Sequence, residues 1–139
     1  MASKLLTTSR QRSELMSRVR QRGTSLELVV RDILRDAAVK FESNATGLAG
    51  TPDIVNREHK WAVFINGCFW HGHTNCWHGQ LPKSNVAFWV RKISANKLRD
   101  QKKVSALRTN GYRVLTLWEC EMEDKGSLSN RLARFIRQK

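Results

Sequence analysis

The fold is decided by one stretch of sequence, Trp61-Ala62-Val63-Phe64-Ile65-Asn66-Gly67-Cys68-Phe69-Trp70-His71-Gly72-His73. Its first five residues form a continuous apolar run, which is typical of a strand covered on both faces. Its second half opens an irregular segment over 67–82 that holds most of the cysteine and histidine. The stretch therefore predicts a buried strand that leads directly into a loop with side chains able to bind metal or take part in catalysis.

Regular elements are predicted on both sides of this strand. Thr24-Ser25-Leu26-Glu27 matches a capping box, in which Glu27 reaches back to the backbone of Thr24, and apolar residues follow it at helical spacing. The predicted elements are helices over 9–19, 25–39, 84–109 and 128–136 and strands over 53–55, 61–65 and 112–118. This order predicts one α/β domain, an α/β/α sandwich around a central mixed sheet.

Charge indicates the kind of partner. The chain of 139 residues carries 25 Lys and Arg against 12 Asp and Glu, a formal net charge of +13. Such a surplus attracts polyanions, so nucleic acid is the favoured partner. An anionic membrane is the rival, but no segment reads as an amphipathic surface helix or as a membrane span. Because the first twelve residues lack the apolar core of a secretory signal, we expect a cytoplasmic protein.

Cysteine and histidine crowd into eleven residues of the loop, and one more cysteine follows the last predicted strand. Zinc prefers four such ligands, some close in sequence and others brought in by the fold. The set that we expect to bind a structural zinc is Cys68, His73, Cys76 and Cys120. The alternative is a group of buried free cysteines with surface histidines.

Two carboxylates occupy unusual positions. Asp100 lies on the apolar stripe of the long helix, where a carboxylate needs a partner, either an arginine or a histidine whose tautomer it fixes. Asp53 opens a strand after a glycine-rich loop, a position that suits a divalent metal and equally a turn. Asp53 with Glu58 and Lys60 superficially spells the PD-(D/E)xK nuclease motif, but the short spacing favours a hairpin turn with His59 at the surface.

Large aromatic residues lie within the Cys/His loop and at the start of the long helix. They are Phe69, Trp70, Trp77, Phe88 and Trp89. Such residues either pad a zinc site or, where they are exposed on a basic protein, act as wedges between base pairs.

Four segments together resemble the very-short-patch-repair (Vsr) mismatch endonucleases. They are Met16 to Arg20, Gly50 to Asp53, Asn66 to His73 with Trp118-Glu119-Cys120, and Phe88 to Ile93. The likeness covers about residues 9 to 121 and implies a restriction-endonuclease-like fold of the PD-(D/E)xK type. It also implies Mg²⁺-dependent nicking of one strand on the 5′ side of the thymine in a T·G mismatch, the product of 5-methylcytosine deamination.

The resemblance assigns roles to individual residues. Asp53 and the backbone carbonyl of Ile65 would bind the catalytic Mg²⁺, with Glu27 close by. His71 would be the general base, oriented by Asp100. The resemblance supports the same four zinc ligands, and it places at the DNA Met16, Phe69, Trp70, Trp89, Lys92 and Asn96.

The resemblance also divides the chain and predicts its partners. Residues 1–22 would be a basic arm that contacts DNA, and 23–139 the endonuclease domain. We expect a monomer that acts on mismatched double-stranded DNA at the nucleoid and contacts other mismatch-repair proteins.

Two departures leave alternatives open. Asn66 stands where the family usually has histidine, and Thr74-Asn75 adds a residue to the zinc loop, so that His78 competes with Cys76 as the fourth ligand. The segment over 79–85 diverges too. The competing hypotheses are a nuclease of the same fold with another target, of restriction or homing type, and a zinc-stabilised DNA-binding module without catalysis.

Overall fold

The structure is a computed structural model that describes residues 24–138. The predicted helix over 9–19, Met16 and the whole of the predicted arm over 1–22 lie outside the described residues. The helices are α3 (Thr24–Asp36), α4 (Val86–Thr109) and α5 (Lys125–Arg137), with two short 3-10 helices, η1 (Trp77–Gly79) and η2 (Glu119–Glu123). The strands are β1 (Glu42–Ser43), β2 (Ile54–Asn56), β3 (Trp61–Asn66) and β4 (Arg113–Trp118).

The four described strands form one mixed sheet in the order β1-β2-β3-β4. β3 runs antiparallel to β2 and parallel to β4, so the two longest strands end at the same edge of the sheet. The mixed sheet is as predicted, and the turn over 57–60 joins β2 to β3 as the predicted hairpin. Glu58 and His59 are exposed in that turn, which confirms that they belong to no buried motif.

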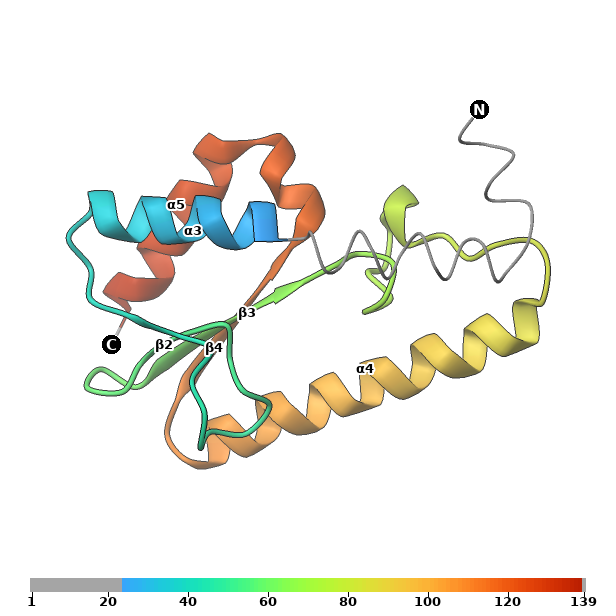
Figure 1. Ribbon diagram of the computed structural model, residues 1–139, viewed down its shortest axis with the longest axis horizontal. Helices are drawn as coiled ribbons and strands as arrows, with labels where there is room; N and C mark the ends of the chain where they lie inside the picture. The colour runs from blue at the N-terminus through green and yellow to red at the C-terminus, as the bar shows by residue number, and fades with distance from the viewer. Residues whose placement is uncertain (1–23, 139) are drawn as a thin grey trace.

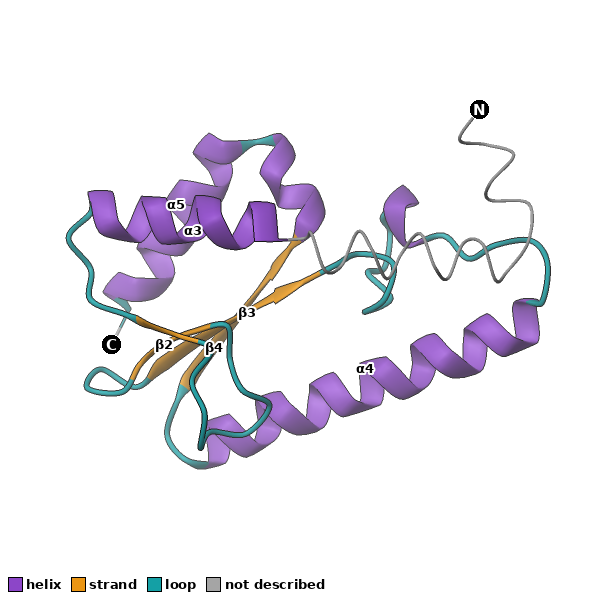
Figure 2. Cartoon of the chain, in the orientation of Figure 1, coloured by secondary structure: helices purple, strands orange, loops and turns teal. Residues whose placement is uncertain are grey.

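Helices cover both faces of the sheet, with α3 and α5 on one side and α4 on the other (Figures 1 and 2). The side chains of β3 alternate between these layers: Trp61 and Val63 pack in the α3 and α5 core, whereas Ala62 and Phe64 pack in the α4 core. All four are buried, which confirms that the apolar run is a strand covered on both faces. The sandwich around a central sheet is therefore observed.

Two predicted helix bounds are wrong by three residues, and α4 begins two residues after its predicted start at Ser84. α3 ends three residues early because Ala38 adopts a left-handed conformation, with φ of 57°. The N–H groups of Val39 and Ala38 then bond back to the carbonyls of Leu34 and Arg35, the hydrogen-bond pattern that closes many helices. α5 begins at Lys125, three residues early, because the side chain of Asp124 caps the N–H of Ser127 at 3.0 Å.

β1 was not predicted from the sequence. It is two residues long and polar, and it exists because Glu42 and Ser43 pair with Val55 and Ile54 of β2. No helix within residues 24–138 is long and apolar enough to cross a membrane.

Candidate active site and Cys/His loop

A cavity of about 290 Å³ opens at the edge of the sheet where β3 ends, between α3 and the middle of α4. Its lining brings together residues that are far apart in the sequence. The ionisable ones are Glu27, Asp53, His71, Asp100, Lys103 and Glu119. Ile65, Asn66 and Trp70 line it as well.

The carboxylate of Asp53 is held at the edge of the sheet, near the end of β3, by a hydrogen bond from the backbone. The N–H of Ile65 donates to Oδ2 of Asp53 at 2.7 Å, so these two predicted metal-binding residues do lie together. The loop before Asp53 turns sharply, with φ of 72° at Gly50 and 47° at Thr51. A β-branched residue rarely adopts the left-handed region, and such strain is typical of functional loops.

The surroundings of Asp53 disfavour its ionised form, which a bound cation would stabilise. Burial raises its pKa, and the charge of Glu27 raises it further, while the Ile65 N–H, His71 and Lys103 lower it. Glu27 is on the first turn of α3 and accepts a hydrogen bond from Arg31 at 3.0 Å. The side chain of Thr24, its partner in the predicted capping box, lies outside the described part of the chain. The oxygen donors of Asp53 and Glu27 suit a hard cation such as Mg²⁺.

His71 and Asp100 meet across the cavity. Nδ1 of His71 lies 2.6 Å from Oδ2 of Asp100, and their side chains are 15% and 23% exposed. Of the two partners predicted for the misplaced carboxylate, the histidine is the one found. Because a carboxylate accepts hydrogen bonds, the contact places the proton on Nδ1 and leaves the lone pair on Nε2, which is the tautomer that a general base requires.

Two ionisable residues of the cavity were missed by the sequence analysis. Lys103 follows Asp100 by three residues on α4, and this spacing on one helix face was the available signal. Glu119 directly follows β4, whose parallel pairing with β3 carries both strand ends to the same edge.

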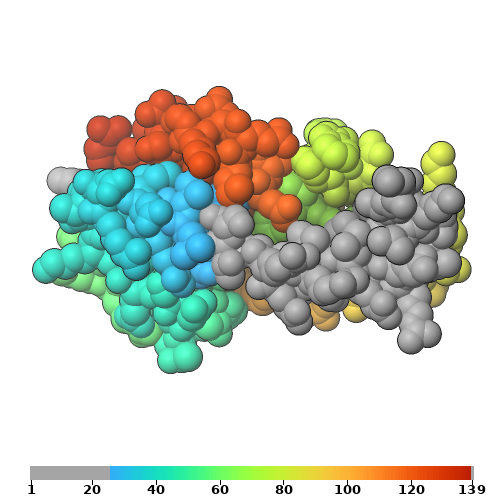
Figure 3. Space-filling model, turned by 45° about the horizontal axis from the view of Figure 1, so that its top comes forward, coloured from blue at the N-terminus to red at the C-terminus, as the bar shows by residue number. Residues whose placement is uncertain are grey.

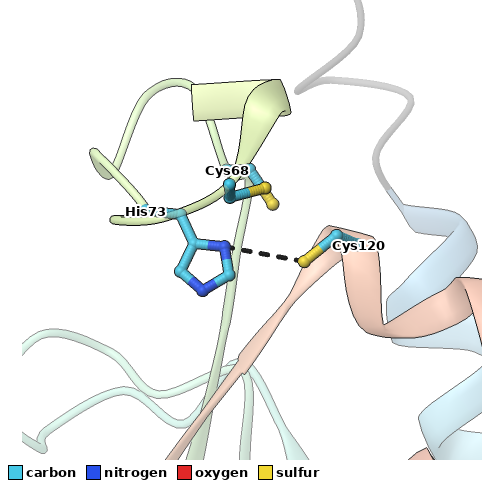
Figure 4. A group of neighbouring side chains, drawn as sticks. Cys68, His73 and Cys120 are labelled. Atoms are coloured by element: carbon cyan, nitrogen blue, oxygen red, sulfur yellow. Dashed lines mark hydrogen bonds between the residues drawn. The ribbon is translucent and has the colours of Figure 1, made fainter. Parts of the chain in front are cut away.

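The Cys/His loop gathers a possible metal site beside this cavity. The ligand atoms of Cys68, His73, Cys76 and Cys120 all lie within 4.8 Å of one another. Nδ1 of His73 is 3.5 Å from the sulfur of Cys120, and Figure 4 shows the two side chains facing each other across the gap between the loop and η2. In Figure 3 the loop and the segment after β4 are neighbours on the surface. Three thiols and one imidazole at such separations match a tetrahedral zinc centre.

Of the two candidates for the fourth ligand, Cys76 is the one within this group. Nε2 of His78 instead pairs with Glu123 at 3.0 Å. The ring of His73 stacks on Trp118, with 4.1 Å between the ring centroids. Burial lowers the pKa of His73 and so favours the neutral imidazole that ligates a metal. Burial raises the pKa of the Cys68 thiol and so opposes the thiolate, which a bound cation would stabilise.

Three of the aromatic residues considered as wedges between base pairs are buried rather than exposed. Phe69, Trp70 and Trp89 are 4%, 7% and 0% exposed, because the loop after β3 folds against the start of α4 and the three rings pack edge to face. The exposed aromatic residues among residues 24–138 are Trp77 and Phe88, at 71% and 48%.

The remaining predicted DNA contacts surround this aromatic cluster. Asn96 donates a hydrogen bond to the carbonyl of Trp70 at 2.9 Å, and the ammonium of Lys92 lies 6.0 Å from the Trp70 ring centroid. Lys92 is exposed and Asn96 is half-buried. Their contact with DNA stays a prediction.

Comparison with known proteins shows the family of the chain. The family model described as DNA mismatch endonuclease Vsr matches residues 5–79. The chain is 44% identical to the Type II nicking enzyme V.XorIIP of Xanthomonas oryzae pv. oryzae over 90% of this chain and 91% of that protein. It is 40% identical to the Type II nicking enzyme V.NmeAIP of Neisseria meningitidis serogroup A, over 96% and 94% of the two chains.

A third relative carries the family's name. The DNA mismatch endonuclease Vsr of Escherichia coli K12 is 34% identical over 86% of this chain and 76% of that protein. These matches confirm the resemblance drawn from the sequence and the prediction of an endonuclease. The chain is a DNA endonuclease that belongs to the Vsr family.

Proposed function

We propose that the protein is a Mg²⁺-dependent endonuclease that nicks one DNA strand on the 5′ side of the thymine in a T·G mismatch. The observation that carries this proposal is the convergence of Asp53 with Ile65 and of His71 with Asp100 on one cavity. Hydrolysis of a phosphodiester needs a group that neutralises charge on the phosphate and a base that activates water. The cavity offers a candidate for each role.

The residues divide the work as follows. Asp53 and the carbonyl of Ile65 would hold Mg²⁺, with Glu27 near its water ligands, and the ion would polarise the phosphate and stabilise the charge that develops on it. Nε2 of His71 accepts a proton from the attacking water, whose oxygen forms a bond to phosphorus as one backbone phosphorus–oxygen bond breaks. Asp100 stabilises the imidazolium that results.

The sheet edge that carries Asp53 supports a restriction-endonuclease-like fold of the PD-(D/E)xK type. In this proposal His71, from the loop after β3, replaces the lysine of that motif as the group beside the water. The four-ligand group of the Cys/His loop would hold a structural zinc that fixes the loop.

The net charge of +13 supports binding to duplex DNA, and the relatives named above are bacterial proteins. The basic arm over 1–22 would contact the DNA together with Met16, Lys92 and Asn96. Contact of Phe69, Trp70 and Trp89 with the bases at the mismatch would require their cluster to open on binding, because the three rings are buried in the free protein. A substrate of this kind places the protein at the nucleoid.

The test uses end-labelled duplexes that differ in one base pair, T·G or T·A, with each strand resolved separately. We expect a nick on the thymine strand of the T·G duplex alone, which disappears in EDTA. Asp53→Ala and His71→Ala should bind this duplex without nicking it. Asp32→Ala, at an exposed carboxylate of α3, is the matched control and should nick normally. Full activity in either active-site variant would refute the assigned roles.

A second target is favoured by the names of two relatives, which are called Type II nicking enzymes rather than mismatch endonucleases. Equal nicking of the T·A duplex would support a nuclease of the same fold directed at a paired sequence. Tight binding of both duplexes with no metal-dependent cleavage would support a binding module instead.

A further inference from the structure

We propose that Lys103 is a further catalytic residue, whose ammonium group binds a non-bridging oxygen of the phosphate that is cut. The inference rests on the proposed function, because it concerns the same cavity. Lys103, on α4, would offer the substrate a positive charge that no other lysine or arginine of the described lining provides.

The charge of the cavity is the first argument. Four carboxylates line it, those of Glu27, Asp53, Asp100 and Glu119, and they repel a phosphodiester anion. Among the described residues of its lining, Lys103 is the one lysine or arginine. The anion therefore meets the ammonium group of Lys103, and a preorganised group of this kind stabilises the charge that develops during reaction.

The position of the lysine stem is the second argument. A Cβ added at Gly50 would lie 2.6 Å from both Cγ and Cδ of Lys103, so the stem runs directly against the backbone of the loop before Asp53. Gly50 is therefore needed twice, for its φ of 72° and for the room that it leaves. This packing orients a side chain that would otherwise be free on a helix surface, and Lys103 remains only 39% exposed.

The neighbours of the ammonium are the third argument. Nζ of Lys103 lies 3.9 Å from Oδ1 of Asp100, whereas His71 contacts the other oxygen, Oδ2, and 3.9 Å is too long for a hydrogen bond. Its charge also lowers the pKa of Asp53. The ammonium thus shares one cavity with the carboxylate proposed for the metal and with the carboxylate that orients the base, and it acts on both through its charge.

The first test compares two methionine variants that remove the same charge. Lys103→Met keeps an unbranched stem against Gly50, whereas Lys102→Met alters the exposed neighbour on α4. With saturating enzyme in a single turnover, we expect Lys103→Met to nick the T·G duplex at least about 100-fold more slowly, the loss typical of one removed charge-stabilising donor. Lys102→Met should stay within about threefold of wild type. Equal rates in the two variants would overturn the inference.

The second test asks whether the contact is with the phosphate. Binding is measured in EDTA with the normal duplex and with one that carries a neutral methylphosphonate at the position of cleavage. Wild type and Lys102→Met should bind the neutral duplex about tenfold or more weakly, because a hydrogen bond to a charged group is lost. Lys103→Met should lose this preference and bind the neutral duplex at least as tightly as the charged one, because the four carboxylates of the cavity then repel the charged phosphate.

The outcomes separate the inference from the function beneath it. If Lys103→Met is slow but still discriminates against the neutral duplex as wild type does, the lysine acts through Asp100 and the inference is overturned. If wild type nicks and Lys103→Met nicks equally fast, the inference alone is overturned. If wild type nicks neither the T·G nor the paired duplex, the proposed function falls and the inference falls with it.

Discussion

The substitution Asp100→Asn tests the central pair of the proposed active site. Asparagine keeps the shape of the side chain and an oxygen that accepts the Nδ1 proton of His71, so the geometry at 2.6 Å has little reason to change. What disappears is the negative charge beside the imidazolium that forms when His71 takes a proton. The variant therefore separates the orientation of the histidine from its electrostatic stabilisation.

The magnitude follows from the separation and the exposure of the two side chains. Unit charges about 4 Å apart interact by about 4 kcal/mol at an effective dielectric constant of about 20, which corresponds to about a thousandfold in rate. Asp100 is 23% exposed and water screens part of this interaction, so we expect a loss of about 100- to 1000-fold. A loss well beyond about 1000-fold would mean that the amide also presents its NH₂ group to the histidine.

The assay is single-turnover nicking of the T·G duplex at saturating protein, with binding measured separately in EDTA. Asp32→Asn is the matched control, because it removes the same charge from an exposed residue whose side chain is 72% exposed. We expect both variants to bind DNA like wild type and only Asp100→Asn to nick slowly. A rate for Asp100→Asn within threefold of that control would refute the reasoning that Asp100 supports the base.

Three further predictions concern stability and metal binding. Asp53→Asn should raise the melting temperature at pH 7 in EDTA, because burial and Glu27 raise the pKa of Asp53 and an ionised carboxylate there destabilises the fold. The gain should vanish as the pH falls below about 4, where Asp53 is protonated in the folded and in the unfolded state, and a gain that persists there would contradict the argument. Metal analysis should find one zinc per chain in wild type and in His78→Ala but a loss in Cys76→Ser, and the reverse pattern would make His78 the fourth ligand. Trp89→Ala should lower the free energy of unfolding by about 3–5 kcal/mol in urea titrations while exposed Phe88→Ala changes it little, and similar losses in both would show that the aromatic cluster is not a core.

Most of the fold could be predicted because each long element has a local cause. The run from Trp61 to Ile65 is apolar at every position and is buried at nearly every one. The length of α4 follows from 24 residues without a breaker before Gly111. β1 had no such signal, since a glutamate and a serine become a strand only when β2 offers them backbone partners.

The candidate site was predictable where a residue stood out of pattern. Asp100 interrupts an apolar stripe, and that irregularity led to its pairing with a histidine. Lys103 gave no comparable sign, because a lysine on a basic helix is the ordinary case and only the fold brings Gly50 against it.

The burial of the aromatic residues could not be predicted from the sequence. Phe69 and Trp70 come from a loop and Trp89 from a helix, so their mutual burial depends on a tertiary contact that no local pattern reports. The same composition also produces Trp77 and Phe88, which remain exposed. Exposure therefore had to be observed, since neither residue type nor spacing distinguishes the two groups.

The two metal sites proposed here are coupled through a short piece of backbone. β3 places Ile65 beside Asp53, and three residues later the same chain supplies Cys68 to the Cys/His group. His71 lies in sequence between Cys68 and His73, and its N–H bonds to the carbonyl of Gly67 while that of His73 bonds to the carbonyl of Cys68.

A metal held by this group would fix both ends of the six-residue turn from Cys68 to His73, on which His71 stands, and Asp100 would fix the His71 ring. Rigid support of this kind is what keeps a base within reach of its water, because small errors in position cost large factors in rate. A structural metal at this group would thus support the proposed catalytic residues through the backbone, although none of its four ligands lines the cavity.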